Sequence, residues 1–380
     1  MESMNDVARR NLPSDIQLCE ACGHIQMSAF TDPDYIYETY LSRPATTNSN
    51  LKSSYQEYAR QLFELFERPL VLEVGSNDGL FLEILGAEGI SAVGIEPAQN
   101  LVTEAKKRNV STVKGYVDAG AVQQALSQLG APPNIIIANH SFSNVEDIRA
   151  WASALSRFLP SGGYLVIQTF YQLDVLRNNL IENYNHEHLS YCTVRSLAAF
   201  LSVYGFRLST AKHLDAKGGS IRCFFKKTTD CVVVDDDTAK LLDQEERFYG
   251  SLEAHFAATS DYIREKRNAL AKIMHSMGAG GSLAAYGTSI GATVFSYQFG
   301  LAEKIKVFFD DDVMRQNRYS PGYGIPVLPG RTAEMNKYSH CIILAPLYAD
   351  AIIRNNHDYL RNGGTFLKFW PEIEEVTWSQ

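Results

Sequence analysis

A glycine-rich turn between an apolar strand and an amphipathic helix is the feature that most constrains this fold. It lies within residues 70–85, which read LVLEVGSNDGLFLEIL. Gly75 and Gly79 are the turn residues, and glycine at such a turn lets the backbone approach a ligand that faces the helix N-terminus. A unit of this kind is typical of a doubly wound α/β domain, so we expect a parallel sheet with crossover helices.

The segments around this turn continue the same pattern. Apolar residues recur at helical spacing from Tyr55 to Phe66, just before the first strand. Further strands are expected at 92–96, 135–139 and 164–169, each separated from the next by a helical or loop segment. This alternation of strands and helices predicts a Rossmann-like domain.

The second half of the chain resumes the α/β pattern after a long helical region. That region runs from Thr238 to Met277 and is expected to connect two domains. Strand-like segments then read SLAAYG, KVFFDDD, HCIILAP and TFLKFW, with helical segments between them. The predicted fold class is therefore α/β, a Rossmann-like domain followed by a second, smaller one. We expect an N-terminal appendage over 1–55, a first α/β domain over 56–213 and a second over 214–380.

Charge and hydropathy argue against several kinds of partner. The 380 residues carry a formal net charge of −8 and contain no dense run of Lys and Arg, so we expect no nucleic-acid binding. No segment offers the ~20 consecutive apolar residues that a membrane span needs, and the start MESMNDVARRNLPSD lacks the apolar core of a signal peptide. These properties are typical of a cytoplasmic protein with a small-molecule substrate, and we expect a monomer or a homodimer.

The spacing and charge of the turn indicate the kind of ligand. Dinucleotide-binding turns favour G-x-G-x-x-G, whereas this turn is E-x-G-x-x-x-G, with Glu73 and Asp78 beside the glycines. Two acids suit a cationic ligand better than a pyrophosphate. The next strand ends in Glu96, where a carboxylate can accept hydrogen bonds from ribose hydroxyls. The alternative is that these glycines and acids serve backbone geometry alone, as they do in many α/β proteins.

These features, in this order, resemble the class I methyltransferases that use S-adenosylmethionine (SAM). The resemblance implies that SAM is the cofactor. It also implies that KGYVDAG (114–120) lines the adenine and that the end of NIIIANHS (134–141) faces the methionine part. The residues that it assigns to cofactor binding are Glu73, Gly75, Asn77, Asp78, Gly79, Glu96, Pro97, Gly115, Tyr116, Asn139 and His140.

Five further motifs narrow the resemblance. They are HEHLSY (186–191), KGGSIR (217–222), AAYGTSIGATVF (284–295), RYSPGYGIPVLP (318–329) and LKFWPEIEEV (367–376). In this order they resemble the sugar C-methyltransferases of bacterial deoxysugar pathways. Those enzymes comprise a small zinc-binding N-terminal domain, a SAM-binding methyltransferase domain and a C-terminal α/β domain that holds a nucleotide-linked keto sugar.

The chemistry that this resemblance implies begins with removal of a proton from a carbon next to a ketone. The resulting enolate then takes the methyl group. His188 is the first choice of base because imidazole titrates near neutral pH, with Glu187 orienting it or the substrate and His186 as the second choice. The alternative is that the histidine pair only caps a loop.

Two amides replace groups that the family uses for proton transfer. Family members usually have a tyrosine before HEH and a histidine in the loop after the fourth SAM strand, where this chain has Asn185 and Asn144. Asparagine cannot transfer a proton but can hold an enolate oxygen by hydrogen bonding, so Asn144 is a candidate catalytic residue. Tyr40 and Tyr184 are candidates for a phenol, although a buried tyrosine is more often a core residue.

The second glycine-rich turn also departs from the family, which usually carries a lysine near the place of Gly291. The hydroxyls of Thr288, Ser289 and Thr293 offer a cradle for phosphate without that cation, and the alternative is that they cap a helix. The missing cation favours a less charged substrate.

The N-terminal metal site is incomplete. A structural zinc usually needs four Cys or His ligands, whereas the chain has Cys19 and Cys22, with His24 as a third ligand at best. We therefore expect no bound metal and a degenerate knuckle that packing holds together.

Three functions are compatible with these observations. The first is SAM-dependent C-methylation of a nucleotide-linked keto-deoxysugar in secondary metabolism or surface glycan biosynthesis. The second is the same chemistry on another enolisable acceptor from natural product biosynthesis. The third is a catalytically silent scaffold with the SAM-binding fold. Retention of Glu73, Asp78, Glu96 and HEH favours an enzyme.

Overall fold

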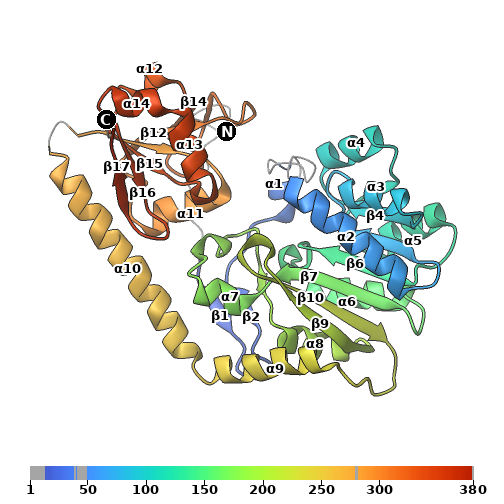
Figure 1. Cartoon of the computed structure of the whole chain (residues 1–380). Helices are drawn as coiled ribbons and strands as arrows, with labels where there is room; N and C mark the ends of the chain where they lie inside the picture. The colour runs from blue at the N-terminus through green and yellow to red at the C-terminus, as the bar shows by residue number, and fades with distance from the viewer. Residues whose placement is uncertain (1–12, 38–39, 41–48, 279–280, 379–380) are drawn as a thin grey trace. The chain divides into compact units, whose positions relative to one another are not determined.

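A computed structural model of the chain describes residues 13–37, 40, 49–278 and 281–378 (Figure 1). It separates into two compact units, residues 14–178 with 186–252, and residues 179–185 with 253–378. The first unit contains a seven-stranded sheet with the order β5-β4-β3-β6-β7-β10-β9. Its strands are β3 (Leu70–Val74), β4 (Ser91–Glu96), β5 (Thr112–Lys114), β6 (Ile135–Asn139), β7 (Tyr164–Phe170), β9 (Phe206–Leu214) and β10 (Ser220–Lys227). Strands β3 to β7 are parallel, as the sequence predicted.

The central strands of this sheet are buried on both faces. Successive residues of a strand point to opposite faces of the sheet, and Ile136 and Ile137 of β6 are both completely buried. Both faces of the sheet are therefore covered. Tyr58 and Phe81 stack at 5.1 Å on one face, within a cluster that α2 and α3 share with β3 and β6. The helices of this unit are α1 (Pro33–Tyr37), α2 (Ser49–Leu65), α3 (Leu80–Ala87), α4 (Gln99–Lys107), α5 (Ala119–Leu129), α6 (Ile148–Phe158), α7 (Gln172–Arg177), α8 (Val194–Ser202) and α9 (Asp236–Tyr249).

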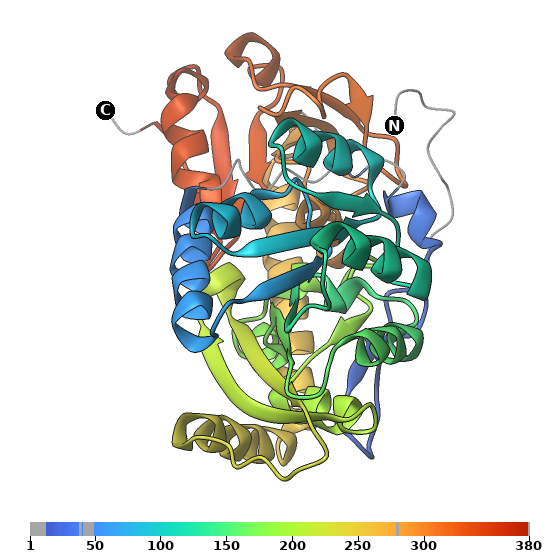
Figure 2. The ribbon, with the colours of Figure 1, turned by 90° about the vertical axis from the view of Figure 1, so that its right-hand side faces the viewer.

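The last two strands of the sheet form a long antiparallel pair, the yellow-green ribbon of Figure 2. Strand β10 pairs with β7 over seven residues and with β9 on its other side. The expected domain boundary after residue 213 lies between these two strands, whereas in the structure β9 and β10 pair within the same compact unit. Because β10 buries Ile221, Cys223 and Phe225 completely, it belongs to the core of the first unit.

The expected N-terminal appendage is also part of the first unit. Its strands β1 (Ile16–Leu18) and β2 (Ile25–Met27) form a small sheet with β8 (Ser190–Tyr191), which follows the HEH motif. Ile25 and Met27 are buried. The segment therefore packs against the region that carries the predicted catalytic residues.

The second unit has its own seven-stranded sheet, with the order β13-β14-β12-β11-β15-β16-β17. Five strands are parallel, and the edge strands β13 and β17 are antiparallel to their neighbours. The strands are β11 (Leu283–Tyr286), β12 (Ile305–Asp310), β13 (Arg318–Tyr319), β14 (Pro326–Pro329), β15 (His340–Ile343), β16 (Thr365–Lys368) and β17 (Glu374–Val376). The predicted second Rossmann-like sheet is therefore present.

Two apolar clusters cover the two faces of this second sheet. One contains Phe295 and Leu270, and the other contains Met335 and Tyr359. The helical region expected over residues 238–277 consists of two helices, α9 and α10, which a turn at Gly250 separates. The helices of this unit are η4 (Ile181–Asn183), α10 (Leu252–Ser276), α11 (Ile290–Gln298), α12 (Thr332–Met335), η6 (Pro346–Tyr348), α13 (Ala349–Asn355) and α14 (His357–Arg361). Within the described ranges, no helix is both long and apolar enough to cross a membrane.

Glu245 of α9 is expected to be a large contributor to stability. Its buried carboxyl group accepts hydrogen bonds from the N–H groups of Val194 and Arg195, at 2.7 and 2.8 Å, in the first turn of α8. Glu245→Ala should lower the free energy of unfolding by about 2–4 kcal/mol, because it leaves two buried donors without an acceptor. Urea denaturation measures this. Glu246→Ala is the control, since exposed Glu246 forms only a surface ion pair with Arg195 and should change it by less than about 1 kcal/mol. Equal effects would contradict this role.

Candidate active site

The candidate site lies at the carboxyl ends of the parallel strands in the first sheet. The chain runs from β3 outward to β4 and β5, and then continues with β6 and β7 on the other side of β3. Ligands of open α/β sheets bind at such a switch point, where the loops after neighbouring strands separate. The predicted cofactor residues are at the carboxyl ends of β3, β4 and β6 and in the loops after β3, β4, β5 and β6.

The turn after β3 has a geometry that requires glycine. Gly75 has a φ of 75°, and a β-carbon there would lie 2.4 Å from the Cβ of Ser141. Ser141 is itself fixed, because its Oγ donates to the carbonyl of Val74 at 2.6 Å. Asn77 also has a positive φ, 51°, and its N–H donates to Oε2 of Glu96 at 2.9 Å. The turn thus brings backbone N–H groups toward the end of β4.

Two of the buried carboxyl groups at this turn have raised pKa values. Glu96 accepts from the N–H of Ala98 through Oε1 at 3.0 Å, and burial raises the pKa of Glu96 to about 7. Glu73 accepts from Nδ2 of Asn139 at 3.2 Å, and burial raises the pKa of Glu73 to about 8. Within the described part of the chain, Oε2 of Glu73 and Oδ1 of Asn139 are buried without hydrogen-bond partners. These acceptors fit a ligand that carries an ammonium group.

An aromatic surface lies beside the turn. The N–H of Gly115 donates to the carbonyl of Glu96 at 3.1 Å, which fixes the loop after β5. Tyr116 is 43% exposed, and its hydroxyl donates to Asp34 at 2.8 Å. The ring of Tyr37 meets it edge-on, with centroids 6.4 Å apart. An exposed ring at this position can stack against a purine base.

Three of the predicted cofactor residues have mainly local contacts. Gly79 has a φ of 78°, and a β-carbon there would lie 2.5 Å from the side chain of Val110. Asp78 is completely buried, with Nη2 of Arg108 4.0 Å from its Oδ2. Pro97 is partly buried after β4. The residue types at Gly79 and Asp78 are explained by backbone geometry and packing alone, which is the alternative given above. A contact of either residue with the cofactor stays a prediction.

The loop that carries HEH is held by the backbone on both sides. The N–H of Leu189 donates to the carbonyl of Ser143 at 2.6 Å, and the carbonyl of Leu189 accepts from Met27 at 2.9 Å. Ser143 is in the loop after β6, so these bonds fix Glu187 and His188 next to that strand end. The structure therefore brings two distant motifs together.

Glu187 is the centre of a polar cluster. Its Oε1 accepts from the hydroxyl of Tyr40 at 2.6 Å and from Nδ2 of Asn144 at 3.3 Å. Asn144 also donates to the hydroxyl of Tyr37 at 2.8 Å. Burial raises the pKa of Glu187, which the hydrogen bond from Tyr40 and the charge of Lys217 partly offset. Three predicted catalytic residues, Glu187, Asn144 and Tyr40, are thus in direct contact.

The two phenols of this cluster are well positioned. Tyr40 exchanges two hydrogen bonds with Asn100 of α4, through its N–H at 3.1 Å and its carbonyl at 2.9 Å. Its ring stacks on that of Tyr37 with centroids 5.6 Å apart. Because Tyr37 also meets the ring of Tyr116, it links the Glu187 cluster to the aromatic surface beside the glycine turn.

The histidines differ in their surroundings. The ring of His188 packs against Phe170 at the end of β7, with centroids 4.3 Å apart. His186 is partly buried in the turn before Glu187. Asn185, by contrast, donates to the carbonyl of Glu182 at 2.9 Å, so its amide serves the local turn.

His140 is a neutral imidazole with a defined tautomer. Nε of Arg222 donates to Oε1 of Gln168 at 2.9 Å, so the amide nitrogen of Gln168 faces Nε2 of His140 at 3.1 Å. That nitrogen can only donate, which assigns the proton of His140 to Nδ1. Burial, helped by the charge of Lys217, lowers the pKa of His140 well below its usual value. A contact of His140 with the cofactor stays a prediction.

Sequence reasoning did not single out Lys217, Tyr37 or Gln168. Lys217 belongs to the quoted motif KGGSIR, and its charge acts on Glu187 and His140. Tyr37 lies in a Tyr-rich segment without a recognisable spacing. A charged residue directly before two glycines was the available signal for Lys217.

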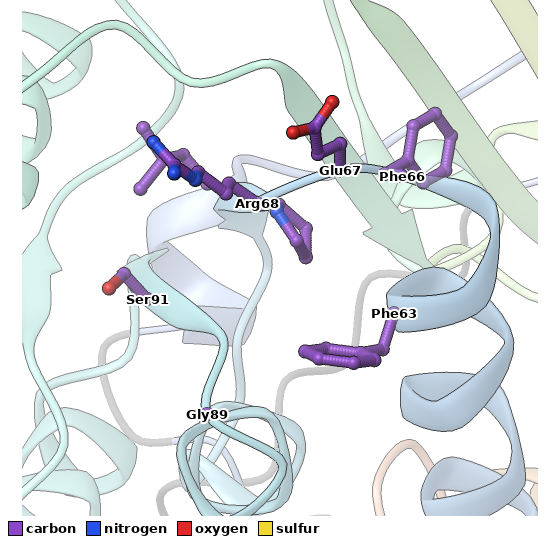
Figure 3. Close-up of a pocket in the computed structure, with 8 residues that line it drawn as sticks. Phe63, Phe66, Glu67, Arg68, Gly89 and Ser91 are labelled. Carbon is purple, nitrogen blue, oxygen red and sulfur yellow. The ribbon is translucent and has the colours of Figure 1, made fainter.

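A surface hollow on the first unit is unrelated to this site. It is lined by Phe63, Phe66, Glu67, Arg68, Pro69, Leu70, Gly89 and Ser91 (Figure 3). Leu70 and Ser91 are the first residues of β3 and β4. The hollow is therefore at the amino ends of the strands, whereas ligands of such sheets bind at the carboxyl ends.

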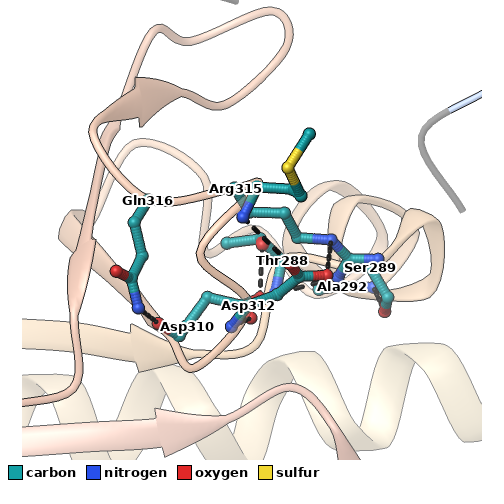
Figure 4. Close-up of polar contacts among 8 residues, drawn as sticks. Thr288, Ser289, Ala292, Asp310, Asp312, Arg315 and Gln316 are labelled. Atoms are coloured by element: carbon teal, nitrogen blue, oxygen red, sulfur yellow. Dashed lines mark hydrogen bonds and ion pairs between the residues drawn. The ribbon is translucent and has the colours of Figure 1, made fainter. Parts of the chain in front are cut away.

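In the glycine-rich turn of the second unit, the hydroxyl groups of Thr288 and Ser289 form hydrogen bonds within the protein (Figure 4). Thr288 donates to Oδ2 of Asp310 through its N–H at 2.9 Å and its hydroxyl at 2.5 Å. Ser289 accepts from the N–H of Ala292 at 3.1 Å and caps α11. Arg315 lies 3.5 Å from the same carboxylate oxygen of Asp310. The capping alternative therefore holds for Ser289.

The cysteine pair lies in the turn between β1 and β2. The N–H of Gly23 donates to the carbonyl of Cys19, and the hydroxyl of Tyr249 donates to the carbonyl of Gly23, at 2.8 and 2.7 Å. Burial lowers the pKa of His24. Across residues 13–37, 40, 49–278 and 281–378, no cluster of three or more His, Cys, Asp or Glu could hold a metal ion. Protein contacts fix the turn in this structure.

Comparison with known families identifies the class of this protein. Residues 48–211 match the family described as methyltransferase domain, and residues 215–371 match the C-methyltransferase C-terminal domain. The fold and the turn after β3 define a class I methyltransferase, and SAM is its cofactor. The chain therefore combines a methyltransferase domain with a C-methyltransferase C-terminal domain. The two matches meet between residues 211 and 215, inside the β9–β10 pair.

A curated relative aligns across both domains. C-methyltransferase NovU from Streptomyces niveus is 26% identical over 377 residues, covering 96% of this chain and 88% of the relative. Among solved structures, a SAM-dependent methyltransferase from Thermotoga maritima is 17% identical over 46% of this chain and 89% of its own, with a TM-score of 0.36. One from Archaeoglobus fulgidus is 16% identical over 46% and 94%, with a TM-score of 0.38.

Cofactor binding is expected to release a proton from Glu73. Its pKa of about 8 keeps it mostly protonated at pH 7, and a bound ammonium group would favour the carboxylate. Binding of S-adenosylhomocysteine (SAH) at pH 7 should therefore release on the order of one proton, and affinity should rise as the pH increases toward 8. Calorimetry in phosphate and in Tris buffer measures the release. Glu73→Gln should remove most of this release, because Glu73 carries more of the bound proton at pH 7 than Glu96 does, whereas Glu83→Gln, on the exposed side of α3, should not change it. Equal heats in the two buffers for the native protein would contradict the prediction.

Proposed function

We propose that this protein methylates an enolisable carbon of a small acceptor, and that the acceptor is a nucleotide-linked keto-deoxysugar. The observation that carries the proposal is the Glu187 cluster. A buried carboxyl group held by Tyr40 and Asn144 lies next to His188, in a loop fixed against the strand end that also carries Asn139. Such a cluster suits proton transfer at a carbon.

The cofactor would be held by the turn after β3 and the loops beside it. Glu73 and Asn139 offer buried acceptors to the amino group, Glu96 offers a carboxylate to the ribose, and Tyr116 offers a ring to the adenine. When bound, SAM supplies an electrophilic methyl group. The close approach at Gly75 leaves room for backbone only, which suits a ligand that contacts this turn.

The residues of the cluster would have different roles in the proton transfer. His188 accepts the proton from the carbon next to the ketone, and its imidazole is the group whose ordinary pKa lies nearest neutrality. Glu187 orients His188 or the acceptor. Asn144 and Tyr40 hold Glu187 in place by donating to Oε1, and the amide of Asn144 can also stabilise an oxygen of the acceptor. His186 is the alternative base.

A second candidate acceptor is a natural product without a nucleotide. The turn at Thr288 favours it, because Ser289 caps α11 and Thr288 binds Asp310, which leaves fewer donors for a phosphate. Glu182 also lies close to Gly291, where a β-carbon would be 3.1 Å from that of Glu182. A carboxyl group near this helix start disfavours an anion.

Calorimetry with two ligands tests the proposal. The full chain is titrated with SAH and then, as the SAH complex, with thymidine diphosphate. Binding of both ligands supports the keto-sugar acceptor. Binding of SAH alone supports the second candidate, and failure to bind SAH would contradict methyltransferase activity altogether.

A further inference from the structure

Lys217 has a backbone conformation that is unusual for lysine. It lies in η5 (Ala216–Gly218), between β9 and β10, with φ 54° and ψ 33°. The next residues, Gly218 and Gly219, have φ values of 83° and 130°. A non-glycine residue in the left-handed region is disfavoured, and such residues concentrate at functional sites.

Other contacts hold the loop in this conformation. The carbonyl of Gly219 accepts from the N–H of Tyr171 at 3.2 Å, and the hydroxyl of Ser220 donates to the carbonyl of Ala216 at 2.8 Å. A β-carbon on Gly219 would lie 2.2 Å from Oδ2 of Asp174 in α7. The loop is thus pressed against the start of α7, directly after β7.

The side chain of Lys217 lies among the predicted catalytic residues. Its Nζ is 6.0 Å from the centre of the Phe170 ring, the same ring that packs against His188 at 4.3 Å and His140 at 5.7 Å. Its charge acts on Glu187 as well. The residue remains open to solvent, although surrounding protein atoms lower the pKa of its ammonium group. Of the residues that the structure describes, none forms an ion pair with Lys217 within 4.0 Å.

We propose that Lys217 stabilises the negative oxygen that forms when the acceptor loses its proton. This inference rests on the proposed function. The C–H bond next to the ketone breaks, its proton passes to His188, and its electron pair forms the enolate double bond. The charge then moves to the former ketone oxygen, to which the ammonium group of Lys217 donates a hydrogen bond. Lys217 stays protonated throughout.

The charges of the site favour this role for Lys217. The lowered pKa of His140 favours its neutral form, and Asn144 and Tyr40 contribute neutral donors, whereas the positive charge of Lys217 acts on both Glu187 and His140. A fixed cation next to developing negative charge is among the largest single effects in catalysis. The strained loop would then serve to position this charge.

Hydrogen exchange of the acceptor tests the proposal without methyl transfer. The full chain is saturated with SAH in D₂O, and deuterium uptake next to the ketone of a thymidine diphosphate 4-keto-6-deoxyhexose is followed by NMR. Lys217→Met should slow uptake by about 10²–10³-fold, whereas Lys217→Arg, which keeps the charge, should slow it by less than about tenfold. Lys212→Met, an exposed lysine of β9, is the matched control and should change it by less than about twofold.

Two further readouts separate this role from a structural one. The affinity for SAH and the melting temperature should be unchanged in Lys217→Met. Native rates of uptake in Lys217→Met would overturn the inference and leave the proposed function intact, and so would equal losses in the methionine and arginine variants. If the native protein binds SAH but exchanges no proton, the keto-sugar proposal fails and the inference fails with it.

Discussion

His188→Asn is expected to slow proton removal from the acceptor by about 10²–10⁴-fold, the range that a positioned general base contributes. Asparagine keeps a polar side chain of similar reach but cannot accept a proton at neutral pH. The affinity for SAH should stay unchanged, because the predicted cofactor residues lie at the ends of β3, β4 and β6 and in the loops after β3 to β6. Deuterium uptake by the keto sugar in the SAH complex measures the effect.

His186→Asn is the matched control for this prediction. It belongs to the same loop, two residues away, and should slow uptake by less than about threefold if His188 is the base. The reverse pattern would assign the base to His186. Native rates in both variants would contradict proton transfer by either histidine, provided that melting temperatures show both variants folded. His188 packs against Phe170, so this check is needed.

Gly75→Ala is expected to abolish measurable binding of SAH. The added β-carbon would lie 2.4 Å from that of Ser141, and a φ of 75° is unfavourable for alanine. Together these effects should cost about 2–4 kcal/mol, and the turn would have to move away from its ligand-binding geometry to relieve them. Calorimetry and thermal melting measure affinity and stability separately.

Gly86→Ala provides the control for this substitution. Gly86 lies within α3, and a β-carbon there would have no neighbour within 4 Å. Alanine should therefore stabilise the helix by about 0.5–1 kcal/mol and leave the affinity for SAH unchanged. Native affinity in Gly75→Ala would show that this turn does not need glycine and would weaken its assignment as the cofactor turn.

Local patterns accounted for most of the first sheet. The expected strands at 135–139 and 164–169 agree with β6 and β7 to within one residue, because continuous apolar runs mark buried parallel strands. The domain boundary expected after residue 213 stays a prediction, since the two family matches separate there whereas β9 and β10 pair across it. Pairing between strands leaves no local trace in the sequence. The break at Gly250 was missed because helical periodicity continues on both sides.

Part of the candidate site could be predicted from the types of residue and their spacing in the sequence. The turn at Gly75 and the acid at Glu96 could be recognised from spacing, since the ligand and the backbone demand them. The contacts of Glu187 could not, because Tyr40 and Asn144 are distant from it along the chain. Lys217 was missed because its neighbour Phe170, at the end of β7, is distant from it along the chain.

The sequence by itself determined the class of fold, the cofactor and the family, because strand periodicity, glycine spacing and ordered motifs are local properties of the chain. Tertiary structure alone decided which of the polar residues meet. Glu187, Tyr40 and Asn144 converge only when β2, β8 and the loop after β6 are assembled, and Thr288 and Ser289 are occupied only once Asp310 and α11 are in place. Hydrogen bonds act over about 3 Å in space, and nothing in the order of residues encodes such a distance.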